Sequence, residues 1–279
     1  LMNAVIRTLG KTPLALAGLF LFGFLTFCAL FAPWLSPHAA QAVFAPMLPP
    51  SLDHLLGTND LGYDLWAEFL QGARFSLALG GCAATASSMM GLFIGVIAGY
   101  QKQLGFVIMR LVDVFLAIPR FPLIILMAAF ARPGFLTLLA FFFLFCWPHT
   151  ARIVYAFIRS ESNRDYITAA IAIGAGKSRI IFIHLFPSAL PLALVRMISE
   201  MQHVILAESG LSFLGLGDPT MRSWGMTLAH AFRYPALLLT DVWKWWVLPS
   251  GLGITVTCLA LVFIGLALDP LANPRLREE

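Results

Sequence analysis

Long apolar segments dominate this sequence and limit what the chain can fold into. Hydrophobic residues make up 59% of the 279 residues and charged residues only 11%, whereas about a quarter of a soluble globular domain is charged. Six runs are close to or above the roughly 20 residues that a helix needs to cross a bilayer: 14–32, 74–100, 105–131, 135–158, 190–207 and 247–268. The sequence therefore predicts an all-α polytopic membrane protein, with residues 1–279 forming one domain of six transmembrane helices.

Lys and Arg are distributed unevenly between the segments that connect these runs. One side of the predicted topology has eleven: Arg7, Lys11, Lys102, Arg110, Arg152, Arg159, Arg164, Lys177, Arg179, Arg275 and Arg277. The other side has five: Arg74, Arg132, Arg222, Arg233 and Lys244. Basic residues favour cytoplasmic loops. We therefore expect both termini inside, periplasmic loops at 33–73 and 208–246, and a cytoplasmic loop at 159–189.

Glycines, prolines and tryptophans in these runs predict how the helices pack. The G-x-x-x-G steps at Gly91, Gly95 and Gly99 predict close approach of a neighbouring helix. Pro119 and Pro122 interrupt the third run. They leave two structures open: a helix broken beside a pathway, or a simple kink near the outer end, which we favour. The Trp residues before the last run predict an aromatic belt at the outer interface: Trp243, Trp245 and Trp246.

The segment between the fourth and fifth runs is charged at both ends and apolar in its middle. Only eleven uncharged residues separate Asp165 from Lys177, too few to span a bilayer. A cap at Ser162 or Asn163 and an end at Gly174 predict a helix of about three turns. Apolar side chains almost all the way round favour docking of a partner protein. The alternative is a connecting helix that rests on its own membrane domain.

The fifth run contains three ionisable residues on one helix face, namely Arg196, Glu200 and His203. Ionisable side chains inside a span usually face the bundle interior or an aqueous path. Glu200 and His203 are therefore candidate pathway residues, and the alternative is an ion pair near the inner surface. An imidazole beside a carboxylate also suits nickel, which makes His203 a candidate metal ligand.

Motifs for catalysis are absent from the sequence. It has no H-E-x-x-H, and residues 210–214, GLSFL, lack the second glycine of a nucleophile elbow. Residues 174–178, GAGKS, lack the upstream glycine and the preceding strand of a P-loop. We therefore expect a non-catalytic membrane subunit that does not hydrolyse ATP and binds no cofactor of its own.

Several motifs together resemble ABC importer permeases of the dipeptide, oligopeptide and nickel branch, specifically the second, C-type permease of the pair. Residues 166–187 resemble the E-A-A loop of that family, with matches at Ala169, Ala170, Gly174, Ile183, His184 and Pro187. Residues 57–64, GTNDLGYD, resemble its G-T-D-x-x-G-R-D motif. Residues 208–217, ESGLSFLGLG, followed by Trp224-Gly225 and by Asp269-Pro270, resemble its other signatures. The resemblance covers nearly the whole chain.

This resemblance implies a type I permease fold with a cytoplasmic coupling helix, in a bacterial inner membrane. The chain would form half of a path for a small solute, either a di- or oligopeptide or a nickel ion or metal chelate. The implied partners are a paralogous permease, two subunits that bind ATP and Mg, and an extracytoplasmic binding protein. The alternative from another class is an ATP-independent channel or secondary carrier.

The resemblance also implies roles for individual residues. ATPase coupling would fall on a helix at 164–179, through Asp165, Tyr166, Ala169, Ala170, Gly174, Ala175 and Arg179. Thr168 stands where the acidic residue of E-A-A is usual, and Asp165 is a candidate substitute. The candidate contacts with a periplasmic gate or a binding protein are Asp60, Asp64, Glu208 and Trp224.

Overall fold

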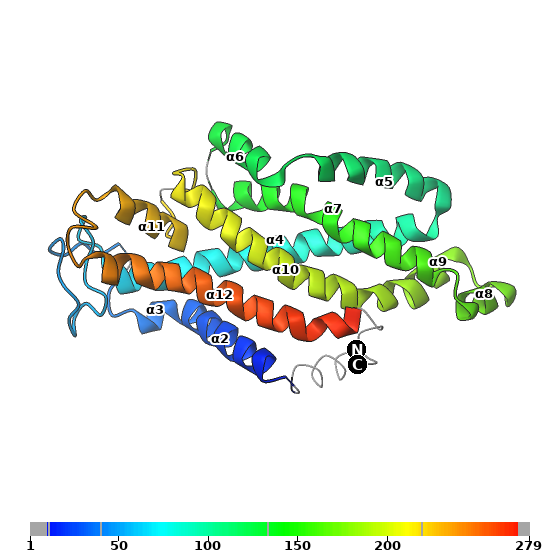
Figure 1. Ribbon diagram of the computed structural model, residues 1–279, viewed down its shortest axis with the longest axis horizontal. Helices are drawn as coiled ribbons and strands as arrows, with labels where there is room; N and C mark the ends of the chain where they lie inside the picture. Colours follow the sequence, from blue (N-terminus) through cyan, green and yellow to red (C-terminus); the bar gives the residue numbers. More distant parts are fainter. Residues whose placement is uncertain (1–9, 11, 40, 133, 219, 273–279) are drawn as a thin grey trace.

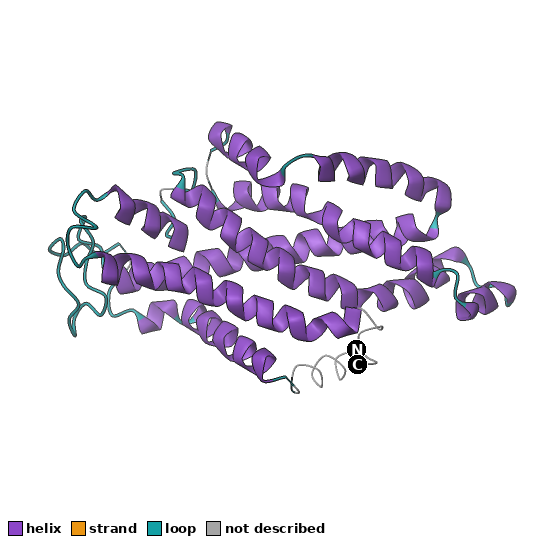
Figure 2. Cartoon of the chain, viewed as in Figure 1, coloured by secondary structure: helices purple, strands orange, loops and turns teal. Residues whose placement is uncertain are grey.

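The computed structural model describes residues 10, 12–39, 41–132, 134–218 and 220–272. The basic residues Arg7, Lys11, Arg275 and Arg277, which the topology prediction used, lie outside them. The described residues are largely helical (Figure 2), and their only β-type pairing is two isolated bridges, Val43 with Tyr63 and Thr58 with Asp64. The expected all-α polytopic class is confirmed.

Five helices run along the long axis of the molecule (Figure 1): α2 (Pro13–Leu30), α4 (Leu65–Tyr100), α7 (Phe135–Glu161), α10 (Phe186–Phe213) and α12 (Trp243–Ala272). α4 packs against both α7 and α10, and α12 packs between α2 and α10. All five are long and apolar enough to cross a membrane, and α5 (Lys102–Ala117) with α6 (Arg120–Phe130) supplies a sixth span if the bent pair counts as one.

Glycines explain the tight contact between α4 and α7. A Cβ atom on Gly91 would lie 2.6 Å from the Thr150 Cβ, and one on Gly95 would lie 2.7 Å from the Val154 Cβ. Such distances are too short for real side chains, so only glycine permits this approach. The packing role predicted for the glycine steps is confirmed.

The third span is broken, which corrects the favoured expectation of a simple kink. α5 and α6 meet at an angle of 76°. Ile118 is extended, with φ −83° and ψ 127°, and Pro119 is the N-cap of α6. Because proline forces the preceding residue out of the helical region, the helix ends there and restarts at a new angle.

Two of the long helices extend well beyond the predicted spans. α4 begins at Leu65 instead of 74, because Asp64 Oδ1 accepts a hydrogen bond from the Ala67 N–H (2.8 Å) and caps the helix. α10 covers residues 186–213 instead of 190–207, so Glu208 is helical rather than part of a loop. Apolar length marks the part of a helix inside lipid and does not mark where the helix ends.

The two ends of the bundle differ in structure (Figure 1). One end carries α8 (Asp165–Ala172), followed by α9 (Lys177–Arg179) and a π-helical turn, Ile180–Leu185, that leads into α10. The other end carries the loop between α3 (Ala32–Leu35) and α4, together with α11 (Trp224–Arg233). Trp246 is only 1% exposed because it packs in a cluster with Leu65 and Leu237. It therefore serves the core and does not join the predicted aromatic belt.

Candidate coupling surface, membrane path and outer cavity

α8 presents an apolar surface at its end of the bundle. Ile167 and Ala170 face inwards, and Ile167 packs with Ile158 and Ile180 in the core. Other apolar side chains, in the last turn of α8 and at its C-cap, are open, with Ile171 52% and Ile173 86% exposed. The helix therefore rests on its own membrane domain through Ile167 and Ala170 and offers exposed apolar side chains for docking at its C-terminal end.

The end of α8 depends on Gly174. This residue has φ +87°, a conformation that side chains other than glycine rarely adopt. The Gly174 N–H donates to the Ile171 carbonyl (2.9 Å), and the Ala175 N–H donates to the Ala170 carbonyl (3.0 Å). This is the Schellman arrangement, so the predicted helix stop at Gly174 is confirmed.

Other features of the predicted coupling helix need correction. The N-cap is Arg164, without a side-chain cap, because Ser162 and Asn163 instead donate to carbonyls in the last turns of α7. α8 has 8 residues, which is about two turns rather than three. Arg179 lies in α9, beyond the Gly174–Gly176 turn, so residues 164–179 do not form a single helix.

The polar residues of α8 divide into bound and free groups. The Tyr166 hydroxyl donates to Glu161 Oε1 (3.0 Å), and Glu161 also pairs with Arg164 (3.1 Å). Burial, together with the Glu161 carboxylate, raises the pKa of Tyr166 to about 12. Thr168 is exposed three residues after the exposed Asp165, so the two side chains lie on one helix face. Asp165 can therefore present the negative charge that Thr168 lacks.

In the middle of the bundle, Glu200 has a partner that the sequence did not reveal. Glu200 is 2% exposed, and its Oε2 accepts from Arg120 Nη1 (2.9 Å). Arg120 is the first residue of α6, so the break in the third span brings it to α10. Arg196, one turn before Glu200, is not its partner, and Arg196 Nε is buried without a hydrogen bond. The one sequence signal that could have marked Arg120 as a functional residue was its position beside two prolines in an apolar run.

A cavity of about 280 Å³ adjoins this ion pair. Its lining is mainly apolar: Arg120, Phe121, Ile124, Phe142, Cys146, His203, Val204, Leu206 and Ala207. His203 is exposed, and its Nδ1 hydrogen-bonds to the Ser199 carbonyl (2.7 Å). Glu200 and His203 therefore differ in their surroundings, since Glu200 is paired with Arg120 and His203 is exposed.

Glu200 and His203 do not form the carboxylate and imidazole pair that was predicted to suit nickel, because Glu200 is already paired with Arg120. Within the described part of the chain, the side chains close enough to share a metal ion are His38, His54 and Asp64, whose ligand atoms lie within 4.8 Å of one another. Two contacts already engage them: His54 Nδ1 with Asp64 Oδ2 (2.7 Å) and His38 Nε2 with the Asp53 carbonyl (2.8 Å). The structure therefore does not place His203 in a metal site.

At the end of the bundle opposite α8, which the sequence predicts to be the outer end, three of the four predicted gate or binding-protein residues are buried. Asp64 caps α4, and Glu208 accepts from Ser76 (3.1 Å) and Ser212 (2.7 Å). Trp224 is fully buried and donates from Nε1 to the Phe69 carbonyl (3.1 Å). Asp60 alone is exposed. The three buried residues hold the outer ends of the helices together, and only Asp60 is accessible to a partner.

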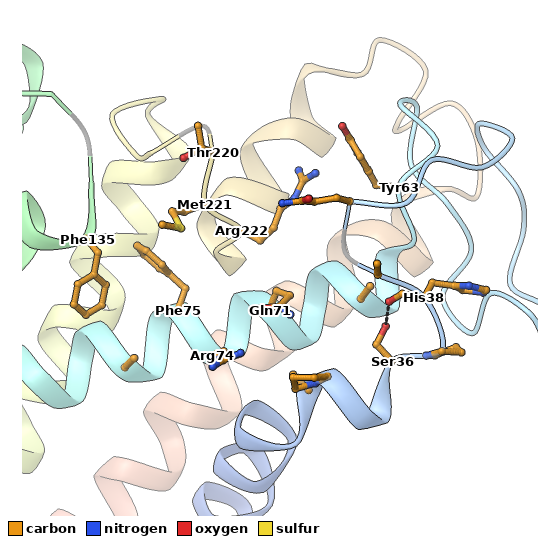
Figure 3. A pocket seen from close by; sticks show the side chains of 17 residues that line it. Ser36, His38, Tyr63, Gln71, Arg74, Phe75, Phe135, Thr220, Met221 and Arg222 are labelled. Carbon is orange, nitrogen blue, oxygen red and sulfur yellow. Dashed lines mark hydrogen bonds between the residues drawn. The ribbon is translucent and has the colours of Figure 1, made fainter.

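A larger cavity, of about 1000 Å³, opens between α4 and the loops at this end (Figure 3). Its wall includes Arg222, which pairs with the buried Glu68 (2.9 Å) and lies over the Tyr63 ring (4.3 Å). Arg74, on α4, also lines it and is exposed. In the sequence these arginines indicate only topology, because no local pattern distinguishes an arginine in a loop from one that lines a cavity.

Comparison with known proteins covers nearly the whole chain. Residues 91–278 match the family model described as "Binding-protein-dependent transport system inner membrane component", and residues 1–66 match the "N-terminal TM domain of oligopeptide transport permease C". The di/tripeptide permease DppC of Pseudomonas aeruginosa is 34% identical over 275 residues, 95% of this chain and 89% of that protein.

Two further relatives come from Bacillus subtilis. The dipeptide permease DppC is 34% identical over 276 residues, 98% of this chain and 85% of that protein. The oligopeptide permease OppC is 31% identical over 269 residues, 95% of this chain and 87% of that protein. With its apolar helices and these matches, the chain belongs to the family of inner membrane components of binding-protein-dependent transport systems, as a multi-pass permease subunit of an ABC importer.

Proposed function

We propose that this permease carries di- or oligopeptides through a path shared with a paralogous permease, and that an extracytoplasmic binding protein delivers them. The relatives reported above are named for dipeptide, di/tripeptide and oligopeptide transport. These names favour peptides over the nickel or metal chelate that the sequence left open, and family membership disfavours an ATP-independent channel or carrier. His203, in the cavity beside Arg120 and Glu200, is the candidate path residue.

In this proposal the α8 end lies in the cytoplasm, where α8 docks into one of two ATP-binding subunits. Those subunits bind and hydrolyse ATP with Mg, and this chain catalyses nothing itself. The observation that carries the assignment is the exposed apolar side chains at the C-terminal end of α8, at the end of the bundle opposite the outer cavity. Closure of the ATPase pair would move the α8 elements together and switch access to the path by rigid-body motion.

Copurification of the ATP-binding subunits with tagged permease tests the docking role. Ile173 and Leu239 are both 86% exposed, and Leu239 lies at the other end of the bundle. Ile173→Asp should abolish copurification, because a carboxylate would be buried in an apolar contact. Leu239→Asp should leave it intact. Gly174→Asp, or deletion of residues 165–176, should also leave the permease in the membrane without its ATPase, and equal recovery with all variants would contradict the proposal.

A further inference from the structure

The outer cavity has a size and a composition suited to a small peptide. Its volume of about 1000 Å³ lies at the upper end of the range for small-molecule sites. One side is apolar, because Phe75, Phe135 and Met221 line it, with the Phe75 and Phe135 rings 5.8 Å apart in an edge-to-face arrangement. Figure 3 shows Phe75 projecting from α4 toward Met221, with Gln71 and Arg74 on the same helix.

The ionisable side chains that line the cavity are basic, apart from the phenol of Tyr63. The described residues that line it include Arg74, Arg222 and His38 but no Asp or Glu. Arg222 is neutralised by the buried Glu68, which also accepts from the Asn59 side chain (3.3 Å). His38 is engaged by the Asp53 carbonyl. Arg74 is thus the lining cation for which the described part of the chain supplies no ion pair.

Arg74 is also placed to act together with a second donor. Gln71 and Arg74 are three residues apart on α4 and line the same cavity, as i and i+3 positions share a helix face. A guanidinium binds a carboxylate with two parallel hydrogen bonds, and a glutamine amide can donate another. An ammonium group, by contrast, would find no carboxylate among the described lining residues. The cavity therefore selects the acidic end of a zwitterionic ligand.

We propose that this cavity is an entry subsite in which Arg74, assisted by Gln71, holds the C-terminal carboxylate of the transported peptide. The apolar wall at Phe75, Phe135 and Met221 accommodates the adjoining side chain. A transporter that accepts many peptides must rely on groups that every peptide shares, and the terminal carboxylate is one of them. The inference rests on the proposed function, since it assumes that the solute is a peptide.

The direct test measures ligand binding to the assembled transporter without its binding protein. Saturation-transfer NMR would compare a dipeptide such as Ala-Phe with its C-terminal amide at millimolar concentration. Wild type should bind the free acid more tightly than the amide. Arg74→Gln should weaken binding of the free acid roughly 10–100-fold, the effect of removing a charge-assisted hydrogen bond, and leave the amide unchanged. Arg132→Gln, an exposed arginine at the same end that does not line the cavity, is the matched control.

Uptake by the complete transporter in proteoliposomes provides the second measurement. Arg74→Gln should raise the KM for the free dipeptide while the binding protein still docks. The inference is overturned if wild type does not bind the free acid, if Arg74→Gln weakens acid and amide equally, or if the variant instead loses the binding protein. Failure of wild type to import any peptide would overturn the proposed function itself, so the two failures are distinguishable.

Discussion

The α8 end and the outer end of this permease handle polar and apolar groups in opposite ways. At α8, apolar side chains such as Ile171 and Ile173 are exposed, and the charged side chains also lie at the surface. At the outer end, the acidic side chains of Glu68 and Glu208 are buried and bonded, and cations line an open cavity. Exposed apolar side chains suit docking of another protein, whereas an open cavity lined by cations suits a small ligand. The difference predicts that removing a buried acidic side chain at the outer end damages the fold, while substituting the exposed apolar side chains at α8 damages association.

The largest expected effect comes from removing Glu68. Glu68→Ala leaves Arg222 without its partner, and breaking a buried ion pair in this way costs about 3–5 kcal/mol. Thermal unfolding of the purified permease in detergent, followed by tryptophan fluorescence, should show a markedly lower midpoint. Asp165→Ala removes an exposed acid at the other end and should leave the midpoint unchanged. Equal unfolding midpoints for the two variants would contradict the predicted difference between the two ends of the bundle.

A smaller effect is expected at the glycines that follow α8. A Cβ on Gly174 or Gly176 would meet no atom within 4 Å, but Gly174 has φ +87° and Gly176 has φ −69°. Gly174→Ala should therefore destabilise the α8 cap by about 1 kcal/mol, and Gly176→Ala should be nearly neutral. Hydrogen exchange of the α8 amides measures this directly. If both variants exchange alike, the left-handed turn does not hold α8 in place.

The smallest effect concerns pH at the outer end. Burial, followed by the charges of Arg222 and Arg233, lowers the pKa of His230 on α11. Protonation of His230 therefore favours the unfolded state. Above the ordinary histidine pKa of about 6.5, the neutral side chain contributes its full stability to the folded protein. This contribution is lost as the pH falls through the lower pKa that His230 has in the folded protein. The unfolding midpoint should drop between pH 7 and pH 5, and His230→Gln should reduce that drop. An identical pH dependence in the two proteins would contradict a lowered pKa for His230.

Features that depend on neighbouring residues were predictable from the sequence. Apolar runs predicted the membrane helices, the glycine steps predicted that a neighbouring helix approaches α4 closely, and Gly174 predicted the end of α8. Hydropathy and backbone conformation are local properties, which is why these predictions were confirmed. The motifs at 57–64, 166–187 and 208–217 likewise predicted the family.

The tertiary structure alone decided which charges meet and which polar residues are buried. Arg120 reaches Glu200 across 80 residues, and Trp224 reaches Phe69 across 155. No local pattern specifies such partners, because they depend on where the third span breaks and how the long helices pack. For the same reason, the sequence did not reveal that three of the predicted gate or binding-protein residues, Asp64, Glu208 and Trp224, are buried and hydrogen-bonded inside the protein. Sequence determined the membrane class and the end of α8 at Gly174, and packing determined that Arg74 lines an open cavity while Arg222 is paired with Glu68.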